Sequence, residues 1–267
     1  MASVFAVKPN RSSPFPQPTR FTPRWGAPKT EGAAATTSPV REPTPGLASD
    51  RLRERMIQRL RDQGIQNPLV LKAMASVPRH QFVDAALASR AYEDSALPIG
   101  HSQTISQPYV VARAIELALT HLPFEQAPGR VLEVGGGCGY QAAVLAKVFA
   151  EVYSVERILG LHQQARRNLF PLALANLHLM HGDGLTASGR SGLFQAIFLA
   201  AGMSDIPLDL LRELHPGGVL VAPLGSPRQK LVVVRVTSGE TQADRPTYER
   251  REFDEVSYVP ILRGLQK

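Results

Sequence analysis

Three glycines at the end of a predicted buried strand are the residues best suited to approach a ligand. In the segment VLEVGGGCGYQAAVLA, Gly135, Gly137 and Gly139 stand where a short apolar run gives way to a helical pattern. Glycine at such a junction lets the backbone turn tightly and approach a ligand without interference from a Cβ atom. A strand-to-helix turn without a ligand often contains glycine as well. These residues therefore indicate a binding loop only in combination with other groups.

Acidic residues follow the next two predicted strands at the same edge of the sheet. Glu156 ends the run EVYSVE, and an acidic residue there can accept hydrogen bonds from both hydroxyls of a ribose. Asp183 and Gly184 end the segment HGDG, where the carboxylate could accept a bond from an adenine amino group; a ligand-free turn is the alternative. The dinucleotide fingerprint requires glycine at position 140, where this chain has Tyr140. The pattern favours a nucleoside ligand without a pyrophosphate.

Other residues with chemical potential are Ser106, two histidines and a lone cysteine. Ser106 precedes a strong helical pattern, so it suits an N-cap, and the start of that helix also presents free N–H groups to an incoming carboxylate. His178 and His181 are three apart on a predicted strand and face opposite sides, so we predict no metal site. Cys138 lies within the glycine loop, which makes it a poor candidate for a nucleophile, and no second cysteine exists to form an internal disulfide.

The elements that must position these residues alternate between strands and helices. From residue 130 onward, short β-branched runs alternate with helical segments, which is typical of a parallel sheet with crossover helices. Strands are predicted at residues 130–134, 151–156, 177–180, 196–199 and 219–223, helices at 139–149, 158–170 and 207–214, and an antiparallel pair at 230–237 and 252–259. Upstream helices are predicted to begin at Ser49 or Asp50, at Asn67 and Pro68, and at Pro108. The predicted fold is α/β, a doubly wound, mostly parallel sheet with N-terminal helices and a C-terminal antiparallel strand pair.

Several segments, in order, resemble the protein-L-isoaspartate O-methyltransferase family. They are SVPRHQFVD, YEDSALPIGHSQTISQPYVVA, EVGGGCGYQ, YSVER, HGDG, PGG and VSYVP, and the resemblance runs from about Asp50 to Pro260. The resemblance implies a Rossmann-like enzyme that uses S-adenosyl-L-methionine to methylate the free α-carboxylate of L-isoaspartyl residues in damaged proteins and peptides. This reaction initiates repair and leaves S-adenosyl-L-homocysteine. The resemblance also makes Ser106 the catalytic residue, places Thr104 and Ile105 at the methyl-donor pocket, and assigns the cofactor to Gly135, Gly137, Gly139, Glu156, Asp183 and Gly184.

The chain departs from the family pattern within the glycine loop. Members commonly have G-T-G-S-G, whereas Gly136 and Cys138 stand here in place of the Thr and the Ser. We expect the missing hydroxyls to weaken contacts to the methionine moiety, although the three glycines that set the backbone path remain. After the fourth predicted strand, Ala200, Ala201 and Gly202 replace a more usual Thr-Ala-Ala run, which affects only local contacts.

Composition limits the partners and the location. The formal net charge is +7, but residues 1–48 hold six basic and two acidic residues, so that segment carries 6 − 2 = +4 and the rest 7 − 4 = +3. This imbalance is a weak argument for nucleic acid, and we expect neither a nucleic-acid nor a membrane partner. Residues 1–48 are rich in Pro, Ala, Ser and Thr and are predicted to be a disordered tail, with a transit peptide or a misplaced start codon as alternatives. Residues 49–267 are then a methyltransferase domain, expected to be a cytoplasmic monomer.

Two other functions compete with the protein-repair hypothesis. One is a methyltransferase for a small molecule or a nucleic acid. Enzymes that methylate base amino groups carry an Asn/Asp-Pro-Pro-aromatic motif after the fourth strand, where this chain reads LAAGMS. The other is a non-catalytic protein that senses the cofactor or captures damaged peptides, which the altered glycine loop leaves open.

Overall fold

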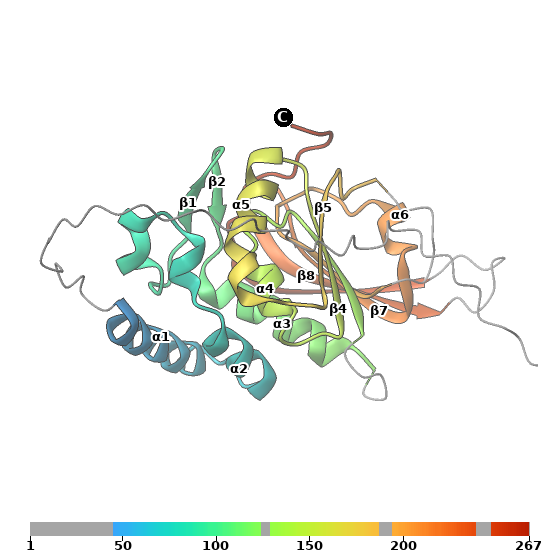
Figure 1. Cartoon of the computed structure of the whole chain (residues 1–267). Helices are drawn as coiled ribbons and strands as arrows, with labels where there is room; N and C mark the ends of the chain where they lie inside the picture. Colours follow the sequence, from blue (N-terminus) through green and yellow to red (C-terminus); the bar gives the residue numbers. More distant parts are fainter. Residues whose placement is uncertain (1–44, 124–128, 187–193, 239–246, 267) are drawn as a thin grey trace, which may run out of the picture. The chain divides into compact units, whose positions relative to one another are not determined.

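A sheet of seven strands forms the centre of the structure. The structure is a computed structural model that describes residues 45–123, 129–186, 194–238 and 247–266. The strand order is β5-β4-β3-β6-β7-β8-β9 (Figure 1). Strands from β5 to β7 run parallel, whereas β8 is antiparallel to both of its neighbours, so the predicted mostly parallel sheet with an antiparallel pair is confirmed. The bounds are β3 Arg130–Val134, β4 Glu151–Glu156, β5 Leu177–His181, β6 Phe194–Leu199, β7 Leu214–Leu224, β8 Gln229–Ser238 and β9 Thr247–Val256.

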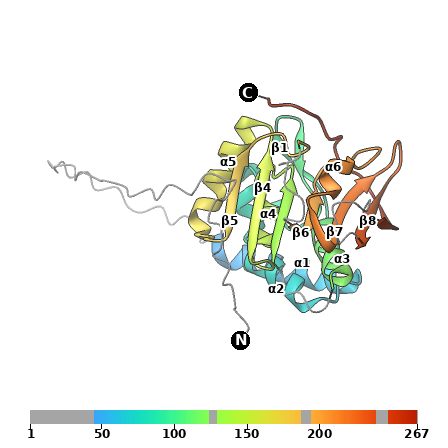
Figure 2. The same ribbon diagram turned by 90° about the vertical axis from the view of Figure 1, so that its right-hand side faces the viewer.

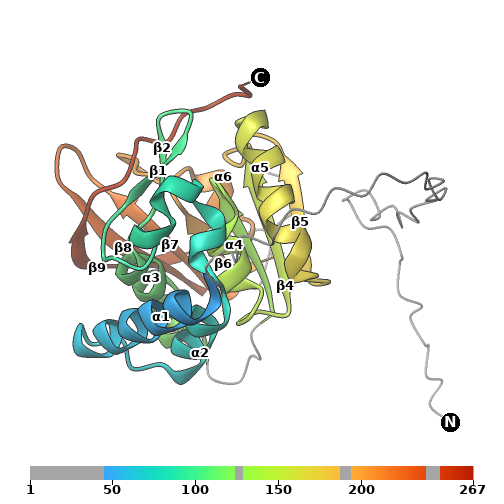
Figure 3. The same ribbon diagram turned by 60° about the vertical axis from the view of Figure 1, so that its left-hand side comes forward.

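Helices cover this sheet in layers. Helices α4 and α5 contact β4, and α3 contacts β7 and β8 (Figure 2). Helices α1 and α2 pack on α3, so they form an outer layer (Figure 3). The apolar core lies between the sheet and these helices. The bounds are α1 Pro45–Asp62, α2 Pro68–Ser76, α3 Pro108–His121, α4 Tyr140–Leu145, α5 Leu159–Leu169 and α6 Leu208–Leu211, with short 3-10 helices η1 Arg79–Phe82, η2 Ala85–Arg90 and η3 Phe170–Leu172.

Local signals account for where several of these helices begin and end. Helix α2 begins as predicted, because the Asn67 side chain accepts hydrogen bonds from the backbone N–H groups of Leu69 and Val70 at 3.0 and 3.4 Å and proline follows it. Helix α1 ends just before Gly64, whose φ of 95° is in the left-handed region. The helix begins at Pro45, several residues before the predicted start at Ser49 or Asp50. The rest of the predicted tail, residues 1–44, lies outside the described residues.

Helix α6 and strand β9 differ in length or position from their predictions. Helix α6 is only four residues long, because the chain enters β7 at Leu214 and the backbone N–H of Phe194 pairs with the Glu213 carbonyl. Strand β9 ends at Val256, earlier than predicted, and the chain then leaves the sheet. Among the described helices, none is long and apolar enough to cross a membrane.

A short hairpin precedes α3 in a segment for which only turn residues were predicted. Strands β1 Leu97–Gly100 and β2 Gln103–Ile105 pair antiparallel, apart from the main sheet (Figure 3). His101 and Ser102 form the turn with φ angles of 51° and 56°, and positive φ at both central residues is the pattern of a type I′ turn. The hairpin leads the chain directly to Ser106 and to the start of α3.

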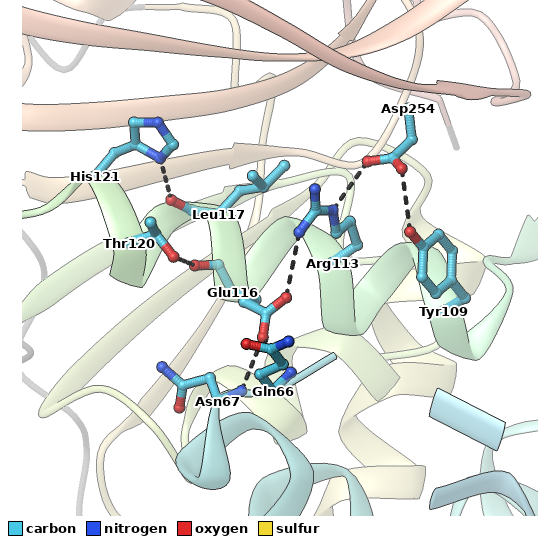
Figure 4. Close-up of polar contacts among 9 residues, drawn as sticks. All are labelled: Gln66, Asn67, Tyr109, Arg113, Glu116, Leu117, Thr120, His121 and Asp254. Atoms are coloured by element: carbon cyan, nitrogen blue, oxygen red, sulfur yellow. Dashed lines mark hydrogen bonds and ion pairs between the residues drawn. The ribbon is translucent and has the colours of Figure 1, made fainter. Parts of the chain in front are cut away.

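A partly buried polar network fixes α3 between the outer helices and the sheet (Figure 4). The Glu116 carboxylate accepts hydrogen bonds from the backbone N–H groups of Gln66 and Asn67 at 2.7 and 2.8 Å. Arg113 bridges Glu116, at 3.3 Å, and Asp254 on β9, at 2.9 Å. The network therefore ties the α1–α2 connection, α3 and β9 together, and it orients the helix that follows Ser106.

Candidate functional site

The glycine loop joins β3 to α4 and folds back onto β4. Gly135, Gly137 and Gly139 have φ angles of 91°, 55° and 88°, a region that residues with a Cβ atom rarely occupy. The backbone N–H groups of Gly135 and Gly136 both donate to the carbonyl of Val155, at 2.8 and 3.2 Å. The glycines are thus required by the backbone path of the loop.

Glu156 is held at the carboxyl end of β4 beside this loop. It is 94% buried, and its two carboxylate oxygens accept the backbone N–H groups of Gly137 at 2.9 Å and Ile158 at 2.8 Å. The parallel register pairs Val134 with Val155, so the ends of β3 and β4 lie side by side. Each carboxylate oxygen can accept a further hydrogen bond. The carboxylate is therefore oriented in advance for donors such as ribose hydroxyls.

A pocket opens at this edge of the sheet, and most of the predicted cofactor-binding residues line it. It encloses about 640 Å³, part of which is open to solvent. Its walls include Thr104, Gly135, Gly137, Glu156, Asp183 and Gly184. Gly139 is not part of the wall. A Cβ atom there would lie 2.7 Å from Leu169 Cδ1, so Gly139 serves the packing of α4 against α5.

A smaller pocket adjoins the first and contains Ser106. It holds about 350 Å³ and is lined by Ser106, Ile105, Glu133 and Cys138, and it shares the walls formed by Ile99, Thr104, Gly135, Gly137 and Ala200 with the larger pocket. The predicted capping role of Ser106 is wrong, because the N-cap of α3 is Gln107, and the backbone N–H of Tyr109 in the first turn donates to Asp94 Oδ1 at 3.4 Å. Ser106 lies near the Tyr258 side chain of the C-terminal segment: burial raises the pKa of the Tyr258 hydroxyl, and Ser106 lowers that pKa by a smaller amount.

Glu133 is a residue of this site that the sequence reasoning missed. Its side chain is fully buried in β3, and its Oε2 accepts a hydrogen bond from Ser154 Oγ at 2.5 Å, while Oε1 has no hydrogen-bond partner. Burial raises the pKa of this carboxyl to about 7, and the neighbouring Glu156 adds to the shift. The sequence signal was an acidic residue in the middle of an apolar strand.

Ser154 also explains how the chain accommodates the altered glycine loop. A Cβ atom at Gly136 would lie 2.3 Å from Ser154 Oγ, so this hydroxyl fills the space that a side chain at position 136 would take. Cys138 is buried, and burial raises the pKa of its thiol to about 11. A thiol that stays protonated is a poor nucleophile, in agreement with the prediction.

The C-terminal strap, residues 258–266, crosses the carboxyl edge of the sheet (Figure 2). Residues 259–262 of this strap line the larger pocket. The backbone N–H of Gly202 donates to the Val259 carbonyl at 2.8 Å, and the N–H of Gly264 donates to Asp183 Oδ2 at 2.7 Å. The Gln229 side chain bonds both the N–H and the carbonyl of Tyr258, at 2.7 and 3.2 Å. The sequence predicted strand to residue 259, so this strap was not foreseen.

Comparison with known proteins identifies the fold and the family of this chain. The fold is that of a Rossmann-like methyltransferase: a crystal structure from Plasmodium falciparum, described as a protein-L-isoaspartate O-methyltransferase in complex with S-adenosyl-L-homocysteine, superposes with a TM-score of 0.65 at 22% identity, covering 78% of this chain and 97% of that one. The family model for protein-L-isoaspartate(D-aspartate) O-methyltransferase matches residues 51–266, and the chain belongs to this family.

Bacterial relatives are similar over most of their length. The protein-L-isoaspartate O-methyltransferase of Bordetella parapertussis is 49% identical over 257 residues, which cover 96% of this chain and 95% of that protein. The protein of the same name from Bordetella petrii is 53% identical over 222 residues, covering 83% of this chain and 78% of that protein.

Proposed function

We propose that this chain transfers a methyl group from S-adenosyl-L-methionine to the free α-carboxylate of L-isoaspartyl residues in damaged proteins and peptides. Family membership supports the reaction. The observation that carries the assignment is the shared wall between two pockets, one bounded by the glycine loop and Glu156 and the other by Ser106. A donor in the first pocket and a carboxylate in the second would meet at that wall.

The residues of the larger pocket fit this methyl donor. When bound, S-adenosyl-L-methionine supplies a methyl group activated by a sulfonium cation, and the product is S-adenosyl-L-homocysteine. Glu156 would hold the ribose hydroxyls, and Asp183 with Gly184 would hold the adenine side. Glu133 has a buried oxygen without a hydrogen-bond partner, which suits a cationic amino group. The backbone of Gly135 and Gly137 would approach the ligand closely.

Ser106 orients the substrate and does not need to activate it. The α-carboxylate of an isoaspartyl residue titrates near pH 3 to 4, so it is already ionised at neutral pH and needs no general base. The Ser106 hydroxyl would donate a hydrogen bond to one carboxylate oxygen and leave the other free to attack. Tyr258 of the strap lies near this hydroxyl. Alignment and exclusion of water by the strap would supply most of the acceleration.

Repair would then continue without the enzyme. The backbone amide attacks the new methyl ester, methanol leaves, and the resulting succinimide hydrolyses in part to normal aspartate. Because the reacting group belongs to the backbone, substrate peptides should bind in an extended form, with residues 256–260 as a candidate edge for backbone pairing. We further propose that the chain acts as a cytoplasmic monomer on proteins, with neither nucleic acid nor membrane as a partner.

The deciding experiment compares two peptides that differ only in one linkage. Radiolabelled S-adenosyl-L-methionine is incubated with the full chain and with matched isoaspartyl and aspartyl peptides, and both label transfer and methanol release are measured. Selective labelling of the isoaspartyl peptide is expected. Binding of that peptide without label transfer would indicate a non-catalytic binder, and labelling of neither peptide would direct the search to small-molecule or nucleic-acid acceptors.

A further inference from the structure

Arg79 in η1 is a fully buried cation that contacts the backbone of the candidate catalytic residue. Its Nε donates to the carbonyl of Ala91 at 2.7 Å, and one terminal nitrogen donates to the carbonyl of Ser106 at 2.6 Å. The other terminal nitrogen is buried and has no hydrogen-bond partner. The guanidinium therefore joins two loop segments and still has donor capacity left.

No carboxylate within the described ranges forms an ion pair with Arg79. Its guanidinium carbon lies 4.7 Å from the centre of the Tyr140 ring, and its hydrogen bonds go to the two backbone carbonyls. Burial lowers the pKa of Arg79, and Asp94, which is not in ion-pair contact, opposes that shift only weakly. Burying a cation without an ion-pair partner is costly, and a positive charge in this setting favours any anion that binds nearby. Two of the residues that it contacts, Ser106 and Tyr140, line the smaller pocket, so the guanidinium lies behind the wall of that pocket.

We propose that Arg79 is a positioning residue for methyl transfer: it fixes the Ser106 backbone and supplies the positive charge that draws the substrate carboxylate into the smaller pocket. This inference rests on the proposed function, because it assumes a carboxylate substrate at Ser106.

The expected size of the charge effect follows from distance. A carboxylate bound to the Ser106 hydroxyl would lie within roughly 10 Å of the guanidinium, given ordinary bond and hydrogen-bond lengths. At an effective dielectric of about 20, opposite charges at that separation favour binding by about fifteenfold. Methyl transfer consumes the carboxylate charge, so Arg79 stabilises the bound substrate more than the transition state. Loss of the charge alone should therefore raise KM for the peptide without lowering kcat, whereas loss of the backbone positioning should lower kcat.

The test uses an isoaspartyl peptide and its neutral α-carboxamide analogue, which differ in charge but little in shape. Calorimetry in the presence of S-adenosyl-L-homocysteine measures the affinity of the full chain for each. The wild type should bind the carboxylate peptide more tightly than the carboxamide peptide. In Arg79→Gln the ratio of the two affinities should be about fifteenfold smaller. Arg79→Lys should keep the preference but turn over about tenfold more slowly, because a single amine cannot reach both carbonyls. Arg90→Gln is the matched control, since Arg90 is exposed and pairs with Glu93 at 3.1 Å.

Each outcome decides one part of the proposal. An Arg79→Gln variant that keeps the full carboxylate preference would overturn the charge role, and an Arg79→Lys variant with wild-type kcat would overturn the positioning role. If Arg79→Gln does not fold, Arg79→Lys decides alone, and loss of its carboxylate preference would then refute the inference. A wild-type chain that neither binds nor labels the isoaspartyl peptide would instead refute the proposed function.

Discussion

Replacing Glu133 by Gln should change how the stability of the protein depends on pH. In the folded state, burial raises the pKa of this carboxyl from 4.5 to about 7. Between these two values the folded state binds more protons than the unfolded state, so the free energy of unfolding falls as the pH rises. The fall begins near pH 4.5, is complete above about pH 7, and is worth about 3 kcal/mol at 1.36 kcal/mol per unit.

The variant removes this contribution, because a glutamine side chain does not titrate. Its carbonyl oxygen can still accept the hydrogen bond from Ser154. Urea unfolding followed by circular dichroism at pH 5, 6, 7 and 8 gives the difference between the variant and the wild type, in which the other titrating groups cancel. The difference should grow in favour of Glu133→Gln as the pH rises and should level off above pH 7.

A second substitution tests the assigned cause. The hydrogen bond from Ser154 lowers the pKa of Glu133 against the effect of burial. Ser154→Ala should therefore extend the pH-dependent range above pH 7. A Glu133→Gln difference that stays constant from pH 5 to 8, or one that grows toward low pH, would refute the reasoning.

Three further predictions concern the pockets and the glycine loop. Ser106→Ala should lower turnover by about 10²-fold while calorimetry shows unchanged S-adenosyl-L-homocysteine affinity; wild-type turnover would remove its catalytic role. Glu156→Ala should weaken cofactor binding by roughly 10- to 100-fold, because it removes charged acceptors and releases the N–H of Gly137, and wild-type affinity in calorimetry would reject the ribose assignment. Gly139→Ala should lower the free energy of unfolding in urea by more than Gly64→Ala, for which we expect a loss of about 1 kcal/mol. Both positions have positive φ, but only a Cβ atom at Gly139 would meet a neighbour, Leu169 at 2.7 Å. Equal losses for the two glycine variants would contradict the packing argument.

The sequence alone determined the elements whose causes are local. Strands β3 and β4 lie at their predicted bounds, since buried parallel strands appear as short apolar runs that end at glycine or at charged residues. Asn67 and Pro68 predicted the start of α2, because helix capping involves only neighbouring residues. The meeting of the glycine loop with Glu156 was also predictable, because parallel strands bring their carboxyl ends to one edge of the sheet.

Only the tertiary structure decided which distant residues complete the site. Arg79 meets the Ser106 carbonyl across 27 residues, and Asp183 meets Gly264 across 81, contacts that no periodicity or local motif encodes. Glu133 is visible in the sequence as an acidic residue in an apolar strand, but its role depends on burial and on Ser154 of the next strand. The physical reason is the same in each case: local patterns specify backbone conformation, whereas desolvation and long-range contacts exist only after the elements have packed.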